Sequence, residues 1–373
     1  MKVLFFIYSL QSGGAERATA NLANYWAEKG HEIIIVTITG KNTDFYLLHP
    51  HIKRIELNMA NNSKNIFKKI YYNIQRIINF RKVLKEENPQ AVIAMMSTAN
   101  IYLSISRIGI KKMICIGTEQ IYPPKIHLGL LWEILRKYLY KNLDSIVTLT
   151  SENATWINNH IHTKHIAIIP NPLTYPLTIQ EPILPIESYM KYGRRILLSV
   201  GRLEYQKGFD LLIETFSLIA DKHNEWDLII IGDGTLKNEI TKMIKEKRLT
   251  NRVFLPGRVG NISQWYKSAD IFVMSSRFEG FPNALIEAMA YGLPAVSFDC
   301  DTGPRDIIRH EIDGLLVPPN NILALKAALE KLMSDEDLRK KLKLHAVEVR
   351  EKFSIENIAN KWESLYNKLK NNQ

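Results

Sequence analysis

The chain has 373 residues, of which 46% are hydrophobic and 23% charged, and its formal net charge is +11 at pH 7. That length accommodates two domains with substantial cores, and the composition is that of a soluble globular protein. We expect neither a membrane-spanning segment nor a signal peptide, because the longest apolar runs are too short to cross a bilayer. Cys115 and Cys300 are the only cysteines, which excludes a disulfide framework and a four-cysteine zinc site and favours a reducing cytosol.

The first half of the chain is typical of a parallel sheet covered by helices. Its strand-like runs are short, apolar and separated by helical periodicity, and they lie at 2–8, 32–38, 91–95, 113–117 and 145–150. Continuous apolar runs of this length indicate strands that are buried on both faces. We expect ligands to bind beyond the carboxyl ends of these strands.

A pair of glycines follows the first run. Gly13 and Gly14 permit a tight turn, and a helix that begins near Ala15 would offer amide donors to an anion. An ordinary strand-to-helix turn would have the same sequence. The motif is not a G-x-G-x-x-G fingerprint, so it gives poor support for dinucleotide binding.

Two segments of the first half hold most of the net charge. Residues 1–180 carry +10 and residues 181–373 only +1. Segment 125–142 has four cations against Glu133, and segment 61–85 has seven cations and no acid. The apolar residues of 61–85 fall near one helical face, a pattern found in interfacial helices and also in helices that pack on a core. The seven cations of 61–85 are Lys64, Lys68, Lys69, Arg76, Arg81, Lys82 and Lys85.

A proline-rich segment separates the first half from a second set of strands. Residues 168–188 contain five prolines, which is typical of a linker. The strand-like runs that follow lie at 195–200, 227–232, 252–257, 270–276 and 294–299. We therefore expect an α/β chain of two Rossmann-like, doubly wound domains with ligands in the cleft between them. The expected limits are an N-terminal domain at 1–170, a linker at 171–192, a second domain at 193–352, and a C-terminal helix at 353–373 that packs back on the N-terminal domain.

Two cations follow the first strand of the second half. In SVGRLEYQKGFDLLIETF, Arg202 comes directly after the strand and Lys207 lies at the mouth of the next helix. A guanidinium and an ammonium that converge on one point suit a diphosphate, whose charge builds up as its bond breaks. Two solvated cations are the alternative interpretation. Their common position at the carboxyl end of a strand favours the functional one.

The most specific pattern is SSRFEGFPNALIEAMAYGLPAVSFD. Glu279 lies in the loop after a strand, and Pro282 and Asn283 are good helix-start residues. Glu287, eight residues beyond Glu279, then falls in the first turns of that helix. Each carboxylate could accept a pair of hydroxyl hydrogen bonds, one pair from a sugar and one from a ribose. The spacing alone is common by chance, but with the Gly-Phe-Pro turn it becomes a strong signal.

These residues resemble a known family. GRLEYQKG, followed by FEGFPNALIEAMAYGLPAV, is similar to family four of the retaining glycosyltransferases. YSLQSGGAER and FSIENIANKWESLY match the two ends of that family, so the resemblance covers nearly the whole chain. It implies the GT-B fold, in which two Rossmann-like domains face a central cleft. FDCDTGPRDIIRHEIDGLLVPP is most similar to bacterial enzymes that extend lipid-linked glycans for O-antigen, capsule or protein N-glycosylation.

The resemblance implies roles for individual residues. Arg202 and Lys207 would hold the diphosphate of a nucleotide-sugar and stabilise it as a leaving group. Glu279 would bind hydroxyls of the donor sugar as the third catalytic residue. Glu287 would bind the ribose hydroxyls, and the backbone around Arg258 would meet the base. Further donor-binding positions would be Gly13, Gly14, Gly201, Gly280, Phe281, Pro282, Asn283, Ala284 and Leu285.

The resemblance also implies the reaction type. The anomeric configuration would be retained by an oxocarbenium-like displacement on one face, with a diphosphate oxygen helping to deprotonate the acceptor, so no carboxylate serves as nucleophile. We expect no metal and no cofactor, because two cations and a helix terminus take the place of an ion. Many relatives have a His after the strand at 113–117. This chain has Glu119 there, which becomes a candidate contact for the donor sugar or the acceptor, and His127 is interpreted as a surface or helix-start residue.

We therefore predict a cytoplasmic enzyme, peripheral on the inner face of the plasma membrane. It would transfer a hexose or N-acetylhexosamine from a UDP-sugar, with UDP-GalNAc favoured, to a lipid-diphosphate-linked glycan of a bacterial surface polysaccharide or glycoprotein. The cations of 61–85 would meet an anionic membrane surface, where each contributes about 1 kcal/mol.

Two other functions stay open at this stage. A non-hydrolysing nucleotide-sugar epimerase of the same fold would use the cleft without an acceptor lipid. A basic nucleic-acid-binding protein would also account for the charge, but the sequence has no recognition module of that kind, so we expect no nucleic-acid partner.

Overall fold

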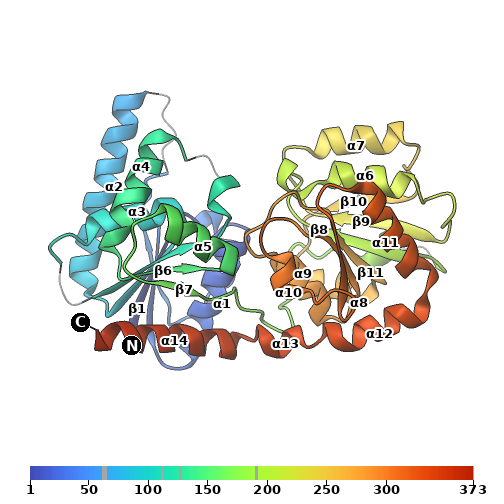
Figure 1. Ribbon diagram of the computed structural model, residues 1–373. Helices are drawn as coiled ribbons and strands as arrows, with labels where there is room; N and C mark the ends of the chain where they lie inside the picture. Colours follow the sequence, from blue (N-terminus) through green and yellow to red (C-terminus); the bar gives the residue numbers. More distant parts are fainter. Residues whose placement is uncertain (61–64, 111–112, 126–127, 190–191, 373) are drawn as a thin grey trace. The chain divides into compact units, whose positions relative to one another are not determined.

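The structure is a computed structural model that describes residues 1–60, 65–110, 113–125, 128–189 and 192–372. The chain forms two compact units: unit 1 comprises Met1–Pro172 and Ile355–Gln373, and unit 2 comprises Leu173–Ser354. Each unit contains one parallel sheet with helices on both faces, as Figure 1 shows. The predicted class of two Rossmann-like domains is confirmed.

Unit 1 is built on a seven-stranded sheet in the order β3-β2-β1-β4-β5-β6-β7. Alternate residues of its central strand face opposite sides: Phe5 lies in the core beside helix α1 (Gly14–Glu28), and Phe6 in the core beside α2 (Ile66–Glu87). The face of α2 is also covered by α3 (Ser97–Ser106), α4 (Leu130–Leu139) and α5 (Ser151–His160). The strands are β1 (Lys2–Ile7), β2 (Glu32–Thr37), β3 (Lys53–Glu56), β4 (Ala91–Met95), β5 (Ile114–Glu119), β6 (Ser145–Thr148) and β7 (Ile166–Ile168).

The last helix of the chain belongs to unit 1. Helix α14 (Ile355–Asn371) places Ile358 and Trp362 in the core beside α1. The indole of Trp26 also donates a hydrogen bond of 3.0 Å to Glu363. The chain therefore passes from one unit to the other twice, after Pro172 and after Ser354.

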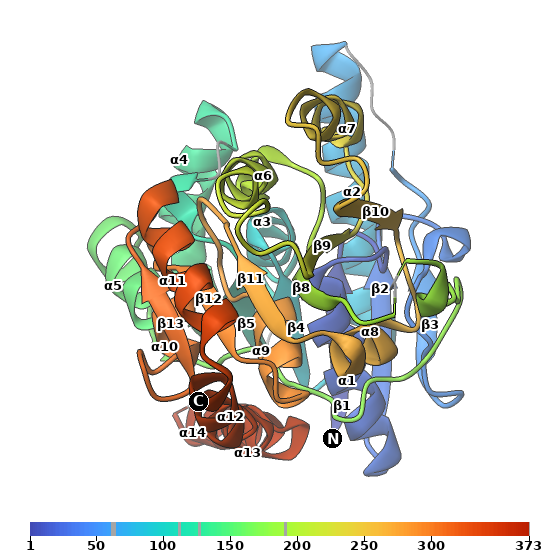
Figure 2. The same ribbon diagram turned by 90° about the vertical axis from the view of Figure 1, so that its right-hand side faces the viewer.

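Unit 2 is built on a six-stranded sheet in the order β10-β9-β8-β11-β12-β13. Helices α6 (Phe209–Ser217), α7 (Lys237–Glu246) and α11 (Ile322–Ser334) cover one face, and α8 (Ile262–Ser268) and α9 (Asn283–Ala290) the other (Figures 1 and 2). The strands are β8 (Arg195–Val200), β9 (Trp226–Ile231), β10 (Val253–Gly257), β11 (Ile271–Met274), β12 (Ala295–Phe298) and β13 (Gly314–Val317), and the other helices are α10 (Pro304–Ile307), α12 (Glu336–Ala346) and α13 (Val349–Lys352).

Three strands are absent from the sequence-based prediction: β3, β7 and β13. Each lies at an edge of its sheet, where it pairs with only one neighbour. They are three or four residues long, and β3 reads KRIE, with three charged residues. β3 therefore lacks the apolar run that marks a buried strand, and the apolar runs of β7 (IAI) and β13 (GLLV) are too short to indicate a strand by themselves.

The segment that we predicted as a linker, 171–192, is held along unit 2 between Leu173 and Leu184. The N–H of Leu173 donates to the carbonyl of Phe353 at 2.7 Å. Further along, the N–H of Gly260 donates to the carbonyl of Pro182 at 2.6 Å, and the N–H of Leu184 to Asn261 Oδ1 at 3.2 Å. The prolines break regular structure there, but the backbone is fastened by hydrogen bonds.

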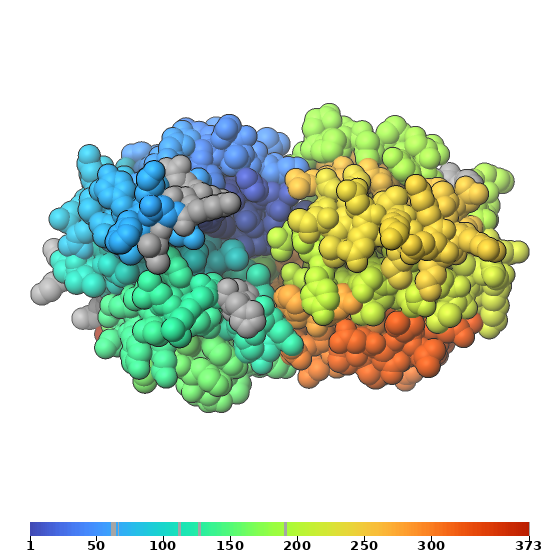
Figure 3. Space-filling view, turned by 90° about the horizontal axis from the view of Figure 1, so that it is seen from above, coloured from blue at the N-terminus to red at the C-terminus, as the bar shows by residue number. Residues whose placement is uncertain are grey.

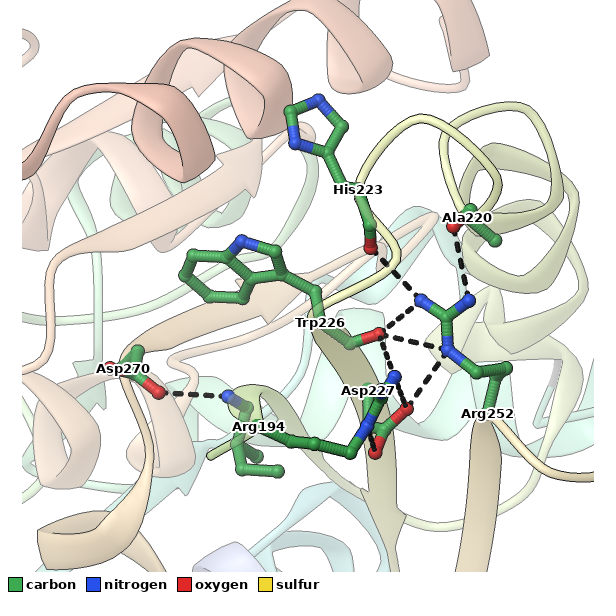
Figure 4. A network of polar contacts seen from close by, with 8 residues as sticks. Arg194, Ala220, His223, Trp226, Asp227, Arg252 and Asp270 are labelled. Carbon is green, nitrogen blue, oxygen red and sulfur yellow. Dashed lines mark hydrogen bonds and ion pairs between the residues drawn. The ribbon is translucent and has the colours of Figure 1, made fainter. Parts of the chain in front are cut away.

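A buried charge cluster ties together the starts of three strands in unit 2 (Figure 4). The side chain of Asp227, near the start of β9, is fully buried and accepts hydrogen bonds from Arg194, just before β8, and from Arg252, just before β10. Arg252 also donates to the carbonyls of Ala220 and His223 at 3.1 and 3.0 Å. The cluster lies at the amino ends of the strands, so it supports the sheet from the edge opposite to the expected ligand site.

None of the helices in the described part of the chain combines the length and the hydropathy needed to span a bilayer.

Candidate donor site

The residues predicted to bind the diphosphate lie in the turn that follows β8. Arg202 comes two residues after the strand and its side chain is exposed. Lys207 ends the turn, and its side chain runs back along Gly201, where an added Cβ would meet the Lys207 methylenes at 3.2 Å. Gly201 thus leaves the Lys207 side chain room to reach back along the turn.

The turn is fastened to the loop that follows β11. Arg277 forms a bidentate ion pair with Asp210, at 2.8 and 2.5 Å, and the hydroxyl of Ser275 donates to the carbonyl of Lys207 at 3.0 Å. Gly208 adopts φ +61°, and a Cβ there would lie 2.1 Å from the Ser275 carbonyl oxygen, so only glycine allows this approach. Burial raises the pKa of Asp210, but the hydrogen bonds and the charge of Arg277, together with backbone hydrogen bonds, outweigh burial and hold this pKa below its ordinary value. Asp210 is therefore charged at neutral pH.

The contacts between the loops after β8 and β11 bring Lys207 and Glu279 into direct contact. The Nζ of Lys207 lies 2.5 Å from Oε1 of Glu279, and Ser276 Oγ donates to the same oxygen at 2.6 Å. The other carboxylate oxygen receives a longer contact of 3.5 Å from Gln206. Glu279 is only 4% exposed, so this charge is compensated by its neighbours rather than by bulk water.

The backbone at Glu279 is supported by the loop that follows β12. The hydroxyl of Thr302 donates to the carbonyl of Glu279 at 2.5 Å. Gly303 adopts φ +98°, and a Cβ there would lie 2.6 Å from Cδ of Pro282. Gly280, Phe281 and Pro282 are buried and lead directly into α9. The first amides of that helix point toward its N-terminus, as in any α-helix, and favour a negative charge there.

The predicted ribose and base contacts lie on the same unit. Glu287, in α9, is 4% exposed and accepts a hydrogen bond of 3.1 Å from the hydroxyl of Tyr266 in α8. Asn283 opens α9, and Ala284 and Leu285 follow it. Arg258 is exposed and comes directly after the end of β10. Arg202, Lys207, Arg258 and Glu279 thus all follow the carboxyl ends of strands in one sheet.

The glycine pair of unit 1 forms the start of α1. Gly13 caps the helix, and its N–H and carbonyl both pair with the hydroxyl of Tyr46, at 3.2 and 3.0 Å. A Cβ on Gly13 would lie 2.2 Å from a carboxylate oxygen of Glu16. Gly14 is the first helical residue. A carboxylate therefore already lies beside this helix start.

Glu119 is the last residue of β5 and points into unit 1. It is 1% exposed and accepts hydrogen bonds from the hydroxyl of Tyr140 and, at 2.8 Å, from Ser97 Oγ. Burial raises the pKa of Glu119, and the charge of Arg136 and the two hydroxyls oppose that rise. The carboxyl group is thus engaged in a polar network inside the fold.

The cations of segment 61–85 are of two kinds in the structure: some are bound to backbone carbonyls and others are exposed. Arg76 donates to the carbonyl of Met59 at 3.0 and 2.7 Å, and Arg81 donates to the carbonyls of Ser106 and Ile108 at 2.6 and 2.5 Å. These two guanidinium groups fasten α2 to unit 1 instead of facing outward. The exposed cations of this segment are Lys68, Lys69, Lys82 and Lys85, and Lys64 lies outside the described residues. His127, in another segment, also lies outside the described residues.

Sequence reasoning missed several residues that hold the candidate site together, among them the Arg277–Asp210 pair and four residues that contact predicted site residues. Gln206 and Ser276 lie inside the quoted motifs, next to Lys207 and three residues before Glu279, so a search for local donors could have found them. Thr302 and Tyr266 are distant in sequence from their partners, and no local pattern marks them. Within the described residues, no cluster of three or more His, Cys, Asp or Glu side chains could hold a metal ion.

Two family models match the two halves of the chain. The family model of Glycosyltransferase Family 4 matches residues 12–174, and the model of Glycosyl transferases group 1 matches residues 187–348. A Campylobacter jejuni enzyme named GalNAc-alpha-(1->4)-GalNAc-alpha-(1->3)-diNAcBac-PP-undecaprenol alpha-1,4-N-acetyl-D-galactosaminyltransferase is 30% identical over 375 residues, which cover 100% of this chain and 99% of the relative.

Two solved structures show the same fold. The sucrose-phosphate synthase of Thermosynechococcus elongatus is similar with a TM-score of 0.85 and 18% identity, and the match covers 100% of both chains. Anabaena Alr3699/HepE in complex with UDP-glucose is similar with a TM-score of 0.79 and 17% identity over 98% of this chain and 99% of that one. The fold is therefore GT-B. With a full-length relative at 30% identity and family models matching both halves, the chain belongs to family four of the glycosyltransferases, which retain the anomeric configuration and generally use no metal cofactor.

Proposed function

We propose that this glycosyltransferase transfers a hexose or N-acetylhexosamine from a UDP-sugar to a lipid-diphosphate-linked glycan during assembly of a bacterial surface polysaccharide or glycoprotein glycan. The observation that carries the proposal is the contact between Lys207 and Glu279 at the carboxyl edge of the six-stranded sheet. In this proposal the cation binds the diphosphate, and the carboxylate beside it accepts hydrogen bonds from sugar hydroxyls. The name of the Campylobacter relative supports a lipid-diphosphate acceptor and favours UDP-GalNAc, and the UDP-glucose complex of the Anabaena protein supports a UDP donor.

The proposed donor contacts follow the sheet edge. Arg202 and Lys207 bind the diphosphate and stabilise the charge that builds up on it. Glu279 accepts hydrogen bonds from donor-sugar hydroxyls beside the backbone of Gly280–Pro282. Glu287 accepts hydrogen bonds from the ribose hydroxyls, and the backbone near Arg258 contacts the base.

Lys207 must change its partner when the donor binds. Its ammonium group pairs with Glu279, and in this proposal it binds the charged oxygens of the diphosphate instead. Ser276 and Gln206 already donate to the Glu279 carboxylate, so they keep this carboxylate in place when Lys207 moves to the diphosphate. The buried carboxylate then keeps two donors and gains the hydroxyls of the sugar.

The transfer retains the configuration at the anomeric carbon. The bond between that carbon and the diphosphate oxygen breaks, and its electron pair leaves with UDP. The acceptor hydroxyl oxygen bonds to the anomeric carbon on the same face, and its proton passes to a diphosphate oxygen. Arg202 and Lys207 lower the barrier by stabilising the departing diphosphate, and no enzyme carboxylate forms a covalent intermediate.

The proposed location is the cytoplasm, peripheral on the inner face of the plasma membrane. A lipid-linked acceptor keeps its diphosphate at the membrane surface, and the exposed lysines of α2 suit an anionic leaflet.

A donor screen tests the proposal. A UDP-sugar that binds the folded chain stabilises it against heat by mass action, by about 2.7 kcal/mol at a concentration of 100 Kd. We expect UDP-GalNAc to raise the unfolding midpoint more than UDP, and to be consumed only when a lipid-diphosphate-linked glycan is added. Conversion of the donor alone to a new epimer would identify an epimerase, and the absence of stabilisation by any UDP-sugar would refute the donor assignment.

A further inference from the structure

Helix α2 has an apolar stripe that faces away from the core of unit 1. Its second half packs against the sheet through Phe80, Val83 and Leu84, which are buried. Between Phe67 and Ile78 it exposes five large apolar side chains at helical spacing, with Phe67 reaching 78% exposure. The stripe consists of Phe67, Ile70, Tyr71, Ile74 and Ile78. The exposed stripe excludes the alternative in which the whole apolar face of the helix in segment 61–85 packs on the domain core.

A second stripe of the same kind lies on α4. Its inner residues, such as Trp132 and Leu135, pack on the core, while four outer residues are between 47% and 80% exposed. The outer residues are Leu130, Leu131, Ile134 and Tyr138. Soluble proteins rarely leave so many large apolar side chains together on helices, and such patches mark interaction sites.

The two stripes belong to one region of unit 1. Helices α2 and α4 both pack against α3, and in Figure 3 their residues, light blue and green, lie on the same face of the unit. Helix α2 leads into β4 and α4 leads into β6, so in a parallel sheet the N-terminal ends of both helices lie at the carboxyl edge. Phe67 and Leu130 open the two stripes at that edge, which is also the edge of the Gly13 turn.

Lysines surround the stripes. Lys68, Lys69, Lys82 and Lys85 are exposed on α2, and Lys82 alone among these four has an ion pair in the described structure, at 3.7 Å with Glu86. Lys137 and Lys141 are exposed beside the α4 stripe. The acid of α4, Glu133, is paired with Arg136. The surface therefore combines apolar side chains with an excess of positive charge, as interfacial helices do.

We propose that the stripes of α2 and α4 form one docking surface that inserts its apolar side chains into the headgroup region of an anionic bilayer while the lysines bind lipid phosphates. This inference rests on the proposed function, in that it specifies how the enzyme meets the membrane. A second copy of the chain is a poor occupant, because two equally positive faces repel each other. A nucleic acid would leave the aliphatic side chains exposed, and the stripes are mainly aliphatic.

Insertion of apolar side chains into the bilayer predicts a different response to salt from electrostatic contact alone. Raising the salt concentration should weaken binding to vesicles of phosphatidylglycerol and phosphatidylcholine but leave a measurable fraction bound. Replacing Phe67, Ile70 and Ile74 by Ser should reduce vesicle affinity at least tenfold, and the pair Leu130→Ser and Leu131→Ser should reduce it through the other helix. The pair Leu323→Ser and Leu344→Ser is the matched control, because both leucines are about 70% exposed but lie on unit 2.

The two native cysteines allow a direct measurement of insertion. Cys115 and Cys300 are buried, so a thiol-reactive, polarity-sensitive fluorophore will label a cysteine introduced at Phe67. We expect a blue shift when anionic vesicles are added to labelled Phe67→Cys and none for labelled Leu344→Cys. Protection by UDP against heat unfolding is measured in parallel for each variant and should not change, which also shows that the variants fold.

The outcomes separate this inference from the proposed function. Loss of UDP protection with normal vesicle binding would refute the donor site alone. Wild-type vesicle affinity in both sets of serine variants, or no blue shift at Phe67, would refute the docking surface alone. Binding to RNA without binding to vesicles, or a dimer that the serine variants dissociate in the absence of lipid, would assign the surface to another partner and overturn the inference.

Discussion

The ammonium group of Lys207 lies 2.5 Å from the carboxylate of Glu279, although the two residues are 72 positions apart in the chain. They come together because two loops after neighbouring strands, β8 and β11, are joined by the Arg277–Asp210 ion pair and by the close approach of Gly208 to Ser275. The contact compensates the charge of a buried carboxylate. It also brings the cation proposed to stabilise the leaving group next to the residue proposed to hold the sugar.

Replacing Lys207 by Ala should reduce turnover by two or more orders of magnitude, because leaving-group stabilisation of this kind contributes about 3 to 4 kcal/mol. Arg202→Ala should act in the same direction. Single-turnover transfer from the best UDP-sugar measures the effect. Lys242→Ala is the control, since Lys242 is an exposed lysine of α7 on the same unit. Near-normal turnover in Lys207→Ala would contradict the diphosphate role.

Ser276→Ala should reduce transfer of the sugar without changing the affinity for the nucleotide. Ser276 donates to Glu279 at 2.6 Å, so its loss lets the carboxylate move when Lys207 leaves it. We expect kcat to fall about tenfold while the affinity for UDP, which has no sugar, stays unchanged. Ser199→Ala removes a buried hydroxyl of the same sheet that donates to Val273, and it should leave both quantities unchanged. Equal losses of UDP affinity and kcat would point to a general structural role for Ser276.

Tyr266→Phe should weaken nucleotide binding. The hydroxyl of Tyr266 donates to Glu287 at 3.1 Å and orients the carboxylate proposed to hold the ribose. A hydrogen bond to a charged group contributes about 1.5 to 3 kcal/mol, and partial compensation by water should leave a threefold to tenfold loss in UDP affinity. Calorimetric titration measures this loss of affinity with UDP and with a deoxy analogue that lacks the ribose hydroxyls. An equal loss for both ligands would argue against the ribose contact.

Asp227→Ala should destabilise unit 2 by about 3 kcal/mol, because it leaves Arg194 and Arg252 without their buried partner. Urea unfolding followed by tryptophan fluorescence detects this change, since Trp226 is adjacent to the cluster shown in Figure 4. The matched control is Glu246→Ala, which removes the exposed pair with Lys242 and should cost less than about 1 kcal/mol. Similar costs in both variants would refute the assignment of a supporting role to the cluster.

Glu119 should give unit 1 a specific dependence on pH. Burial raises the pKa of Glu119 above its ordinary value of 4.5, so between these two pKa values the folded chain binds more protons than the unfolded chain. The contribution of Glu119 to the free energy of unfolding therefore decreases as pH rises through that window. Glu119→Gln lacks this contribution, so its stability relative to the wild type should improve from pH 4.5 upward. Urea titrations across pH 4.5 to 8 measure the difference, and parallel curves would contradict it.

Much of the fold could be predicted from the sequence because the patterns that mark its strands lie within short stretches of the chain. The central strands contain continuous apolar runs such as VLFFI and LIII, which only a sheet covered on both faces buries. The three strands that were missed are three or four residues long, so their patterns are too short to identify a strand. The motifs around Arg202, Lys207, Glu279 and Glu287 were also readable, because each follows a strand that could be predicted.

The sequence by itself determined the fold class, the family resemblance and the residue types of the donor site, because these depend on composition and spacing along the chain. Tertiary structure decided which side chains meet. It paired Lys207 with Glu279 and Tyr266 with Glu287, turned Glu119 into the core, and committed Arg76 and Arg81 to backbone carbonyls while the neighbouring lysines stayed exposed. The physical reason is that the partners of a buried charge come from whichever elements pack beside it, and that packing joins residues far apart in the chain.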